Sequence, residues 1–278
     1  MATHPFNRKN ILKMIRFIKS NIVTHALEKL FNHSFTPLLF CFLLVGYLTP
    51  ATVQAQFELE YCIDIGGADP GTTRDGATAT VSDDNGFLYV LGRLADTADV
   101  DPGPGKTLVG NPDTLSLLLA KFDSTGALVW AYTVPTGGSS QGYDITWDGV
   151  GHIYITGNFD ITGDFDFGPG TTTLDRTNGS IFVAKYDLDA NLAWAFNVGS
   201  LQAGVGMGIQ VDGDGNVIIG GEFRGVPDFD PGPATAFGTN SALFNAFMAQ
   251  YTSDGNYIWH RDAADGNRGR AFPMGVDA

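Results

Sequence analysis

The chain has 278 residues and a formal net charge of −14, and its 36 glycines and 13 prolines predict many turns. An acidic chain offers no basic face to a phosphate backbone, so the composition argues against nucleic acid as a partner. With two cysteines, Cys41 and Cys62, the chain cannot carry the disulfide framework of a small secreted domain.

Residues 1–55 differ in kind from the rest and are predicted to be a secretory signal region. They hold six of the 16 lysines and arginines but one of the 30 acids. The apolar run "PLLFCFLLVGYL" (37–48) is short for a bilayer span, which needs roughly twenty residues. Small residues then precede an expected cleavage after Ala55. We expect an extracellular or cell-surface protein that meets the membrane only through this region, and an uncleaved anchor is the alternative.

Residues 56–278 keep 29 acids and 10 bases, a formal charge of −19. Such a surplus keeps an exported protein soluble by self-repulsion, and it attracts divalent cations. Cys62 has no partner in this part of the chain, so burial and strand pairing must hold the fold.

One unit recurs through 76–278 at a period of 64 to 65 residues. Four positions recur in every unit. They are a turn glycine (Gly86, Gly151 and Gly215), a glycine expected to end the next strand (Gly92, Gly157 and Gly221), an acid (Asp101, Asp166 and Asp230) and a tryptophan (Trp130, Trp194 and Trp259). Alternating apolar residues predict four short strands in each unit, placed in the second unit at 142–148, 152–159, 180–187 and 191–198. The stretch "DGDGN" (212–216) is typical of a hairpin turn.

A four-stranded antiparallel sheet repeated in tandem cannot bury both of its faces alone, so each copy must stack on the next. The predicted fold class is therefore all-β, a β-propeller of four-stranded antiparallel blades, with the repeated tryptophans filling the gaps between blades. The chain would form an incomplete ring, with single strands at each end. Its parts are a closing strand and linker (56–75), three blades (76–141, 142–205 and 206–270) and the start of a truncated fourth blade (271–278).

Three stretches carry a resemblance to a known family: "VDGDGNVIIGGEF" (211–223), "DFDPGP" (228–233) and "IFVAKYDLDANLAWAF" (181–196). At these residues the chain resembles the SBBP family, bacterial secreted proteins with β-propeller repeats, and the likeness extends over nearly all of 76–278. The resemblance implies an exported or surface-held propeller, often within a longer chain that ends in a sorting domain. It implies no activity.

Paired acids recur once in each unit, in the loop between the second and third strands: Asp99 and Asp101, Asp164 and Asp166, Asp228 and Asp230. Residues two apart in extended chain project to the same side, and in a propeller these loops would lie on one face. Oxygen ligands on a glycine-rich loop are typical of calcium sites, so calcium is one interpretation and the only cofactor that the sequence suggests. The other interpretation is that aspartate caps the loop backbone while Pro-Gly turns it.

General acid-base catalysis has few candidates in residues 56–278, because their two histidines, His152 and His260, fall at unrelated places in the repeat. The sequence therefore favours a non-catalytic binding or scaffold module that binds a protein or glycan ligand at its loop face. The alternative is a propeller-type polysaccharide hydrolase or lyase with an acid pair in the central funnel.

Overall fold

The structure, a computed structural model, describes residues 75–112, 114–135, 138–200 and 202–263. The predicted signal region (1–55), nearly all of the predicted closing strand and linker (56–75) and the start of the predicted fourth blade (271–278) lie outside the described residues. Within the described ranges, no helix is both long enough and apolar enough to cross a membrane.

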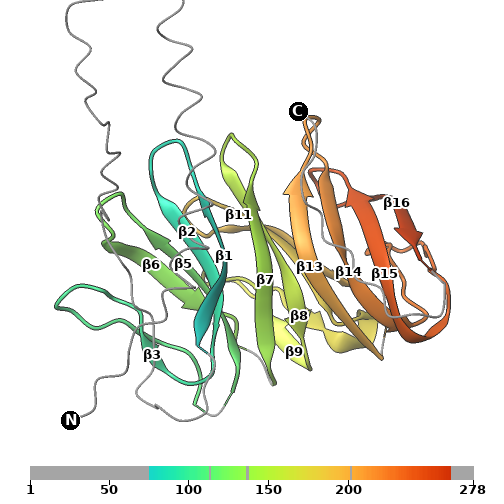
Figure 1. Cartoon of the computed structure of the whole chain (residues 1–278), viewed down its shortest axis with the longest axis horizontal. Coiled ribbons are helices and arrows are strands. Elements are labelled where there is room, and N and C mark those ends of the chain that lie inside the picture. Colours follow the sequence, from blue (N-terminus) through green and yellow to red (C-terminus); the bar gives the residue numbers. More distant parts are fainter. Residues whose placement is uncertain (1–74, 113, 136–137, 201, 264–278) are drawn as a thin grey trace, which may run out of the picture. The chain divides into compact units, whose positions relative to one another are not determined.

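The described residues form an all-β fold of three four-stranded antiparallel sheets (Figure 1). In each sheet the strands are neighbours in chain order, which confirms the repeated four-stranded unit. The first sheet is β1 (Gly76–Ser82), β2 (Leu88–Leu94), β5 (Ser116–Phe122) and β6 (Leu128–Thr133); the second is β7 (Ser140–Trp147), β8 (His152–Phe159), β11 (Ile181–Asp187) and β12 (Leu192–Val198); the third is β13 (Ala203–Val211), β14 (Val217–Gly225), β15 (Ser241–Tyr251) and β16 (Tyr257–Asp262).

The loop between the second and third strands of a sheet is more ordered than the sequence pattern indicated. In the first sheet it pairs β3 (Ala98–Asp99) with β4 (Leu108–Val109), and in the second it pairs β9 (Thr162–Asp164) with β10 (Thr173–Asp175), followed by one 3-10 turn, η1 (Arg176–Asn178). The third loop keeps a single bridge, between Asp228 and Phe237. Each acidic loop is thus closed at its base by strand-like pairing.

The second recurring glycine lies inside its strand, and the expectation that it ends the strand is wrong. Gly157 faces a β-bulge between Gly142 and Asp144 on β7. A Cβ on Gly157 would lie 1.9 Å from the carbonyl oxygen of Gln141, and Gly221 has an equally close neighbour in the third sheet. The bulge presses a carbonyl against the second strand, so only glycine fits there.

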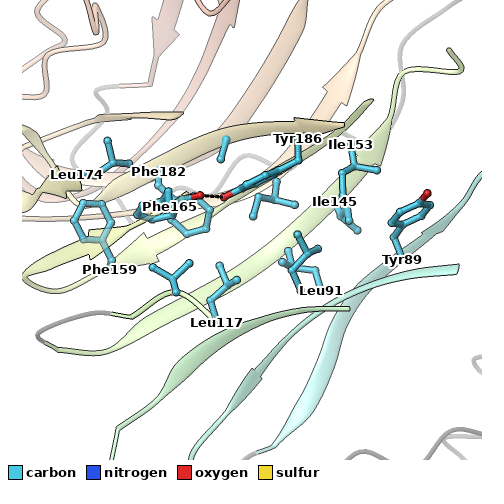
Figure 2. Packing of buried hydrophobic residues seen from close by; sticks show 14 residues of the cluster. Tyr89, Leu91, Leu117, Ile145, Ile153, Phe159, Phe165, Leu174, Phe182 and Tyr186 are labelled. Carbon is cyan, nitrogen blue, oxygen red and sulfur yellow. Dashed lines mark hydrogen bonds between the residues drawn. The ribbon is translucent and has the colours of Figure 1, made fainter. Parts of the chain in front are cut away.

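Most buried apolar side chains belong to two clusters between neighbouring sheets, and Figure 2 shows the cluster between the first and second sheets. Leu91 of the first sheet belongs to one buried cluster with Ile153 and Tyr186 of the second. Val183 of the second sheet belongs to another with Ile219 of the third. The consecutive units therefore stack face to face, and this burial is the main favourable contribution to their association.

Two tryptophans pack in the gaps between sheets, as the repeat predicted. Trp130 packs against the first cluster, with its ring centroid 6.1 Å from that of Tyr89. Trp194 packs against the second cluster, and its Nε1 donates a 3.1 Å hydrogen bond to the carbonyl of Ser253 in the third sheet.

A lysine on the third strand also crosses each junction between sheets. Lys121 Nζ donates a 2.8 Å hydrogen bond to the carbonyl of Leu188, and Lys185 Nζ donates a 3.1 Å hydrogen bond to the carbonyl of Ser253. Both side chains are buried, and Lys185 Nζ lies 5.1 Å from the centre of the Tyr154 ring. A buried ammonium is thus satisfied by a turn carbonyl of the next sheet and by an aromatic face.

Candidate functional site

The stretch "DGDGN" forms a hairpin turn, as its sequence predicted. Asp212 Oδ1 accepts hydrogen bonds from the backbone N–H groups of Asp214 (3.0 Å) and Asn216 (2.8 Å), and Gly215 has a φ of 81°. The carboxylate therefore caps the turn between β13 and β14.

The paired acids of the three long loops also bind their own backbone, with one pattern in all three copies. In the third loop, Asp228 Oδ1 accepts from the N–H groups of Asp230 (3.1 Å) and Ala236 (2.8 Å), and Asp230 Oδ1 accepts from Gly232 (2.7 Å). The corresponding bonds of Asp99, Asp101, Asp164 and Asp166 range from 2.8 to 3.2 Å. These contacts favour the interpretation in which aspartate caps the loop.

The residue between the two acids is buried in every copy: Val100, Phe165 and Phe229. In the second and third copies a tyrosine holds its carbonyl, with Tyr186 Oη donating to Phe165 (2.8 Å) and Tyr251 Oη donating to Phe229 (3.0 Å). Burial raises the pKa of both tyrosines well above the usual value, with smaller effects of Asp166 and Asp164 on Tyr186, and of Tyr257, Asp230 and Asp228 on Tyr251. The second and third acidic loops are therefore held to the third strand of their own sheets, whereas Phe122 takes the place of the tyrosine in the first sheet.

The structure brings the acids together within each pair but not between pairs. Among the described residues, no group of three or more His, Cys, Asp or Glu side chains is arranged to hold a metal ion. Calcium binding by these loops stays a prediction.

One acidic loop borders a groove. The groove has a volume of about 500 Å³ and lies where β12 of the second sheet meets the third acidic loop. Its lining includes Phe196 and Asn197 from β12, and Asp228, Asp230 and Pro231 from the loop. A second hollow of about 390 Å³ adjoins it and shares Phe196, Asp230 and Pro231. We call the two together the junction groove.

Backbone pairing fixes the acidic wall of the junction groove against the second sheet. Asp228 donates its N–H to the carbonyl of Gly199 (2.9 Å), and Gly199 donates its N–H to the carbonyl of Asp228 (3.0 Å). At the junction of the first two sheets, Pro135 occupies the position of Gly199 and accepts a single bond, from Asp164 (3.2 Å). The third loop is thus tied to β12 by two bonds, which places both carboxylates beside Phe196.

One side-chain difference separates the junction groove from the equivalent place between the first two sheets. There Phe167 stacks on Tyr132, with ring centroids 5.0 Å apart and planes at 9°, and on Tyr186 at 5.0 Å and 16°. In the third loop the position of Phe167 is taken by Pro231. The smaller ring cannot fill the space between the loop and the outer strand, so the junction groove is left beside it.

Sequence reasoning named Asp228 and Asp230 but missed Phe196 and Pro231, the other walls of the junction groove. The available signal was the residue after the second acid, which is Phe167 in the second loop but Pro102 in the first and Pro231 in the third, because a smaller ring at a packed junction leaves space. Its meaning depends on the neighbouring sheet, which the sequence of a single unit does not contain.

The two histidines among the described residues, His152 and His260, lie in ordinary structural positions. His152 Nδ1 lies 2.9 Å from Asp148 Oδ2 in the turn between β7 and β8, and His260 Nδ1 lies 2.8 Å from Tyr257 Oη on β16. Neither is among the described residues that line the junction groove. The chemistry that the groove offers is an aromatic face, an amide and two carboxylates, which suits the binding of a polar or cationic group.

Comparisons with known proteins give distant matches. No model of a protein family matches the chain, so membership of the SBBP family stays a prediction. The uncharacterized WD repeat-containing protein L264 of Acanthamoeba polyphaga mimivirus is 27% identical over 192 residues, which cover 58% of this chain and 13% of that protein. A crystal structure of a protein of unknown function from Bacteroides caccae aligns with a TM-score of 0.27 and 9% identity, over 71% of this chain and 85% of that chain.

Proposed function

We propose that this chain is part of an exported β-propeller repeat protein and acts as a non-catalytic binding or scaffold module, which takes a protein or glycan ligand at its loop face. The observation that carries the proposal is the junction groove, which Phe196, Asp228 and Asp230 line together. An aromatic face beside a few fixed polar groups is the usual composition of a recognition site.

The rest of the fold is consistent with a scaffold. The three sheets repeat one plan, and their polar side chains serve mainly to cap turns and to join sheets, as Asp212 and Lys185 do. The likeness to a WD repeat-containing protein is compatible with a propeller-type architecture. A scaffold of repeated sheets can gain specificity at positions that differ between copies, and the position of Pro231 is one of them, with Phe167 in the second loop and Pro102 in the first.

The proposal can be tested by probing arrays of peptides and oligosaccharides with the full chain and with a Pro231→Phe variant. Phe167 shows that the loop accepts phenylalanine at this position, so the variant should fold and fill the junction groove. We expect the native chain to bind a subset of the array and the variant to lose that binding. Binding that Pro231→Phe leaves unchanged would contradict the proposed role of the groove, and hydrolysis of an arrayed polysaccharide would contradict the proposal of a non-catalytic module.

A further inference from the structure

The junction groove is acidic and has no basic wall among the described residues. Its lining residues with a formal charge are Asp228 and Asp230, and its lining contains no lysine, arginine or histidine. In both carboxylates the Oδ1 atom accepts a backbone N–H, and no described residue donates a hydrogen bond to Oδ2. The groove therefore presents negative charge to whatever enters it, and a cationic group complements that charge.

The aromatic side of the groove, the ring of Phe196, indicates which kind of cation fits there. Phe196 is half-buried and stacks on Trp194, with ring centroids 5.2 Å apart and planes at 18°. It also contacts Tyr251 at a centroid distance of 4.9 Å, so both neighbours hold the ring in place. A fixed aromatic face next to carboxylates matches a guanidinium group, which is planar, stacks on rings and binds carboxylates through paired N–H groups.

The protein already places basic side chains between its sheets in a related way. Lys121 Nζ lies 4.3 Å from the centre of the Phe87 ring and 3.9 Å from Asp189 Oδ1 while it crosses the first junction. An aromatic face and an acidic group therefore accommodate a cation elsewhere in this fold. The junction groove offers the same two kinds of group, with no cation of its own among the described residues.

We propose that the junction groove binds an arginine side chain of a protein partner, with the guanidinium against the carboxylates of Asp228 and Asp230 and its plane over Phe196. This inference rests on the proposed binding function and names the class of its ligand. It commits to a protein rather than a glycan, because a neutral sugar would leave the charge of the groove unmatched.

The test is a titration of the full chain, labelled with ¹⁵N-glycine, with N-acetyl-arginine methylamide. Gly199 and Gly232 line the junction groove and report on binding, while Gly103 and Gly168 occupy the matching place in the other acidic loops and serve as references. N-acetyl-citrulline methylamide has nearly the same shape without the charge, and maltotriose represents a glycan. We expect saturable shifts at Gly199 and Gly232 with the arginine compound, at least tenfold weaker binding of the citrulline compound, and weaker arginine binding as salt is raised.

Two variants link the signal to the site. Asp230→Asn keeps an oxygen to accept the Gly232 N–H but removes the charge, and it should weaken arginine binding about tenfold. Asp166→Asn makes the same change in the second loop and should leave binding unchanged. Pro231→Phe should abolish the shifts by filling the groove.

The outcomes separate the two proposals. Shifts with maltotriose alone, or equal shifts with arginine and citrulline, would overturn the arginine assignment and leave the binding function standing. The absence of shifts with every compound would overturn the arginine assignment, and the arrays would then decide whether a binding function exists. Equal weakening by Asp230→Asn and Asp166→Asn would show that the effect is not local to the groove and would also overturn the assignment.

Discussion

At the scale of single residues, every hairpin turn of the three sheets contains one residue with positive φ. Five of these residues are glycines, Gly86, Gly126, Gly149, Gly215 and Gly255, with φ between 78° and 83°, and the sixth is Ala190, with a φ of 64°. Glycine reaches this region without steric cost, while a side chain costs about 1 kcal/mol or more there. Ala190 shows that the fold tolerates that cost once.

Gly149 and Gly151 lie in one turn, and substituting each with alanine distinguishes the cost of backbone strain from the cost of packing. Gly149 has a φ of 78°, whereas Gly151 does not have a positive φ, and a Cβ on either would meet nothing within 4 Å. We expect Gly149→Ala to lower the free energy of unfolding by about 1 kcal/mol, and Gly151→Ala to leave it unchanged or raise it slightly. Urea titration of both variants measures the difference, and equal effects would contradict the assignment of strain to position 149.

The aspartate that caps the same turn makes stability depend on pH. Burial raises the pKa of Asp148, but hydrogen bonds from the N–H groups of Gly151, His152 and Val150 outweigh it and hold the pKa below its usual value. Because the pKa is lower in the folded state than the unfolded value of about 3.9, the carboxylate contributes stability above about pH 4. That contribution is lost as the pH falls through the folded-state pKa.

We therefore expect the native chain to lose more free energy of unfolding between pH 6 and pH 3 than an Asp148→Asn variant does. Asparagine keeps an oxygen to accept the backbone bonds and does not titrate, while every other acid is common to the two proteins. Urea titrations at the two pH values measure the effect. Equal losses would show that the cap does not depend on the charge of Asp148.

At the scale of elements, the second and third acidic loops are anchored through the backbone of their buried middle residues. Tyr186 Oη donates to the carbonyl of Phe165 in the core, and both residues are fully buried. Tyr186→Phe leaves that carbonyl without a partner, and we expect it to lower the free energy of unfolding by about 1 to 2 kcal/mol. Tyr132→Phe is the control, because it keeps the stacked ring and removes a hydroxyl that holds no loop. A cost for Tyr132→Phe as large as that for Tyr186→Phe would contradict this role of the hydroxyl.

The strands could be predicted from sequence because alternation of apolar residues is a local signal. The stretch 152–159 was predicted as a strand and is β8, and the turn at Gly215 was predicted from the stretch "DGDGN". The position of Gly157 inside its strand was missed, since the requirement for glycine comes from a bulge on β7. The junction groove was missed for the same kind of reason, because side chains of two sheets define it.

At the scale of the whole array, the first and second sheets each bury one face against the following sheet, and comparison with the third sheet shows the effect of that burial. Val183 on β11 is fully buried, and Leu119 on β5, its counterpart in the first sheet, is also fully buried. Met248 holds the same position on β15 and is 38% exposed. The difference comes from the neighbouring sheet, since the strand, the register and the apolar character are the same in all three copies.

Matched lysine substitutions at this position measure how much the neighbouring sheet contributes. Val183→Lys places an unpaired ammonium in the cluster between the second and third sheets, and we expect it to lower the free energy of unfolding by about 3 kcal/mol or more. Met248→Lys keeps its long stem on the sheet with the charge in water, and we expect a change within about 0.5 kcal/mol. Urea titration of both full-length variants gives the comparison. Similar costs would mean that the third sheet is covered as tightly as the others, and similar tolerance would mean that the sheets do not stabilise one another by stacking.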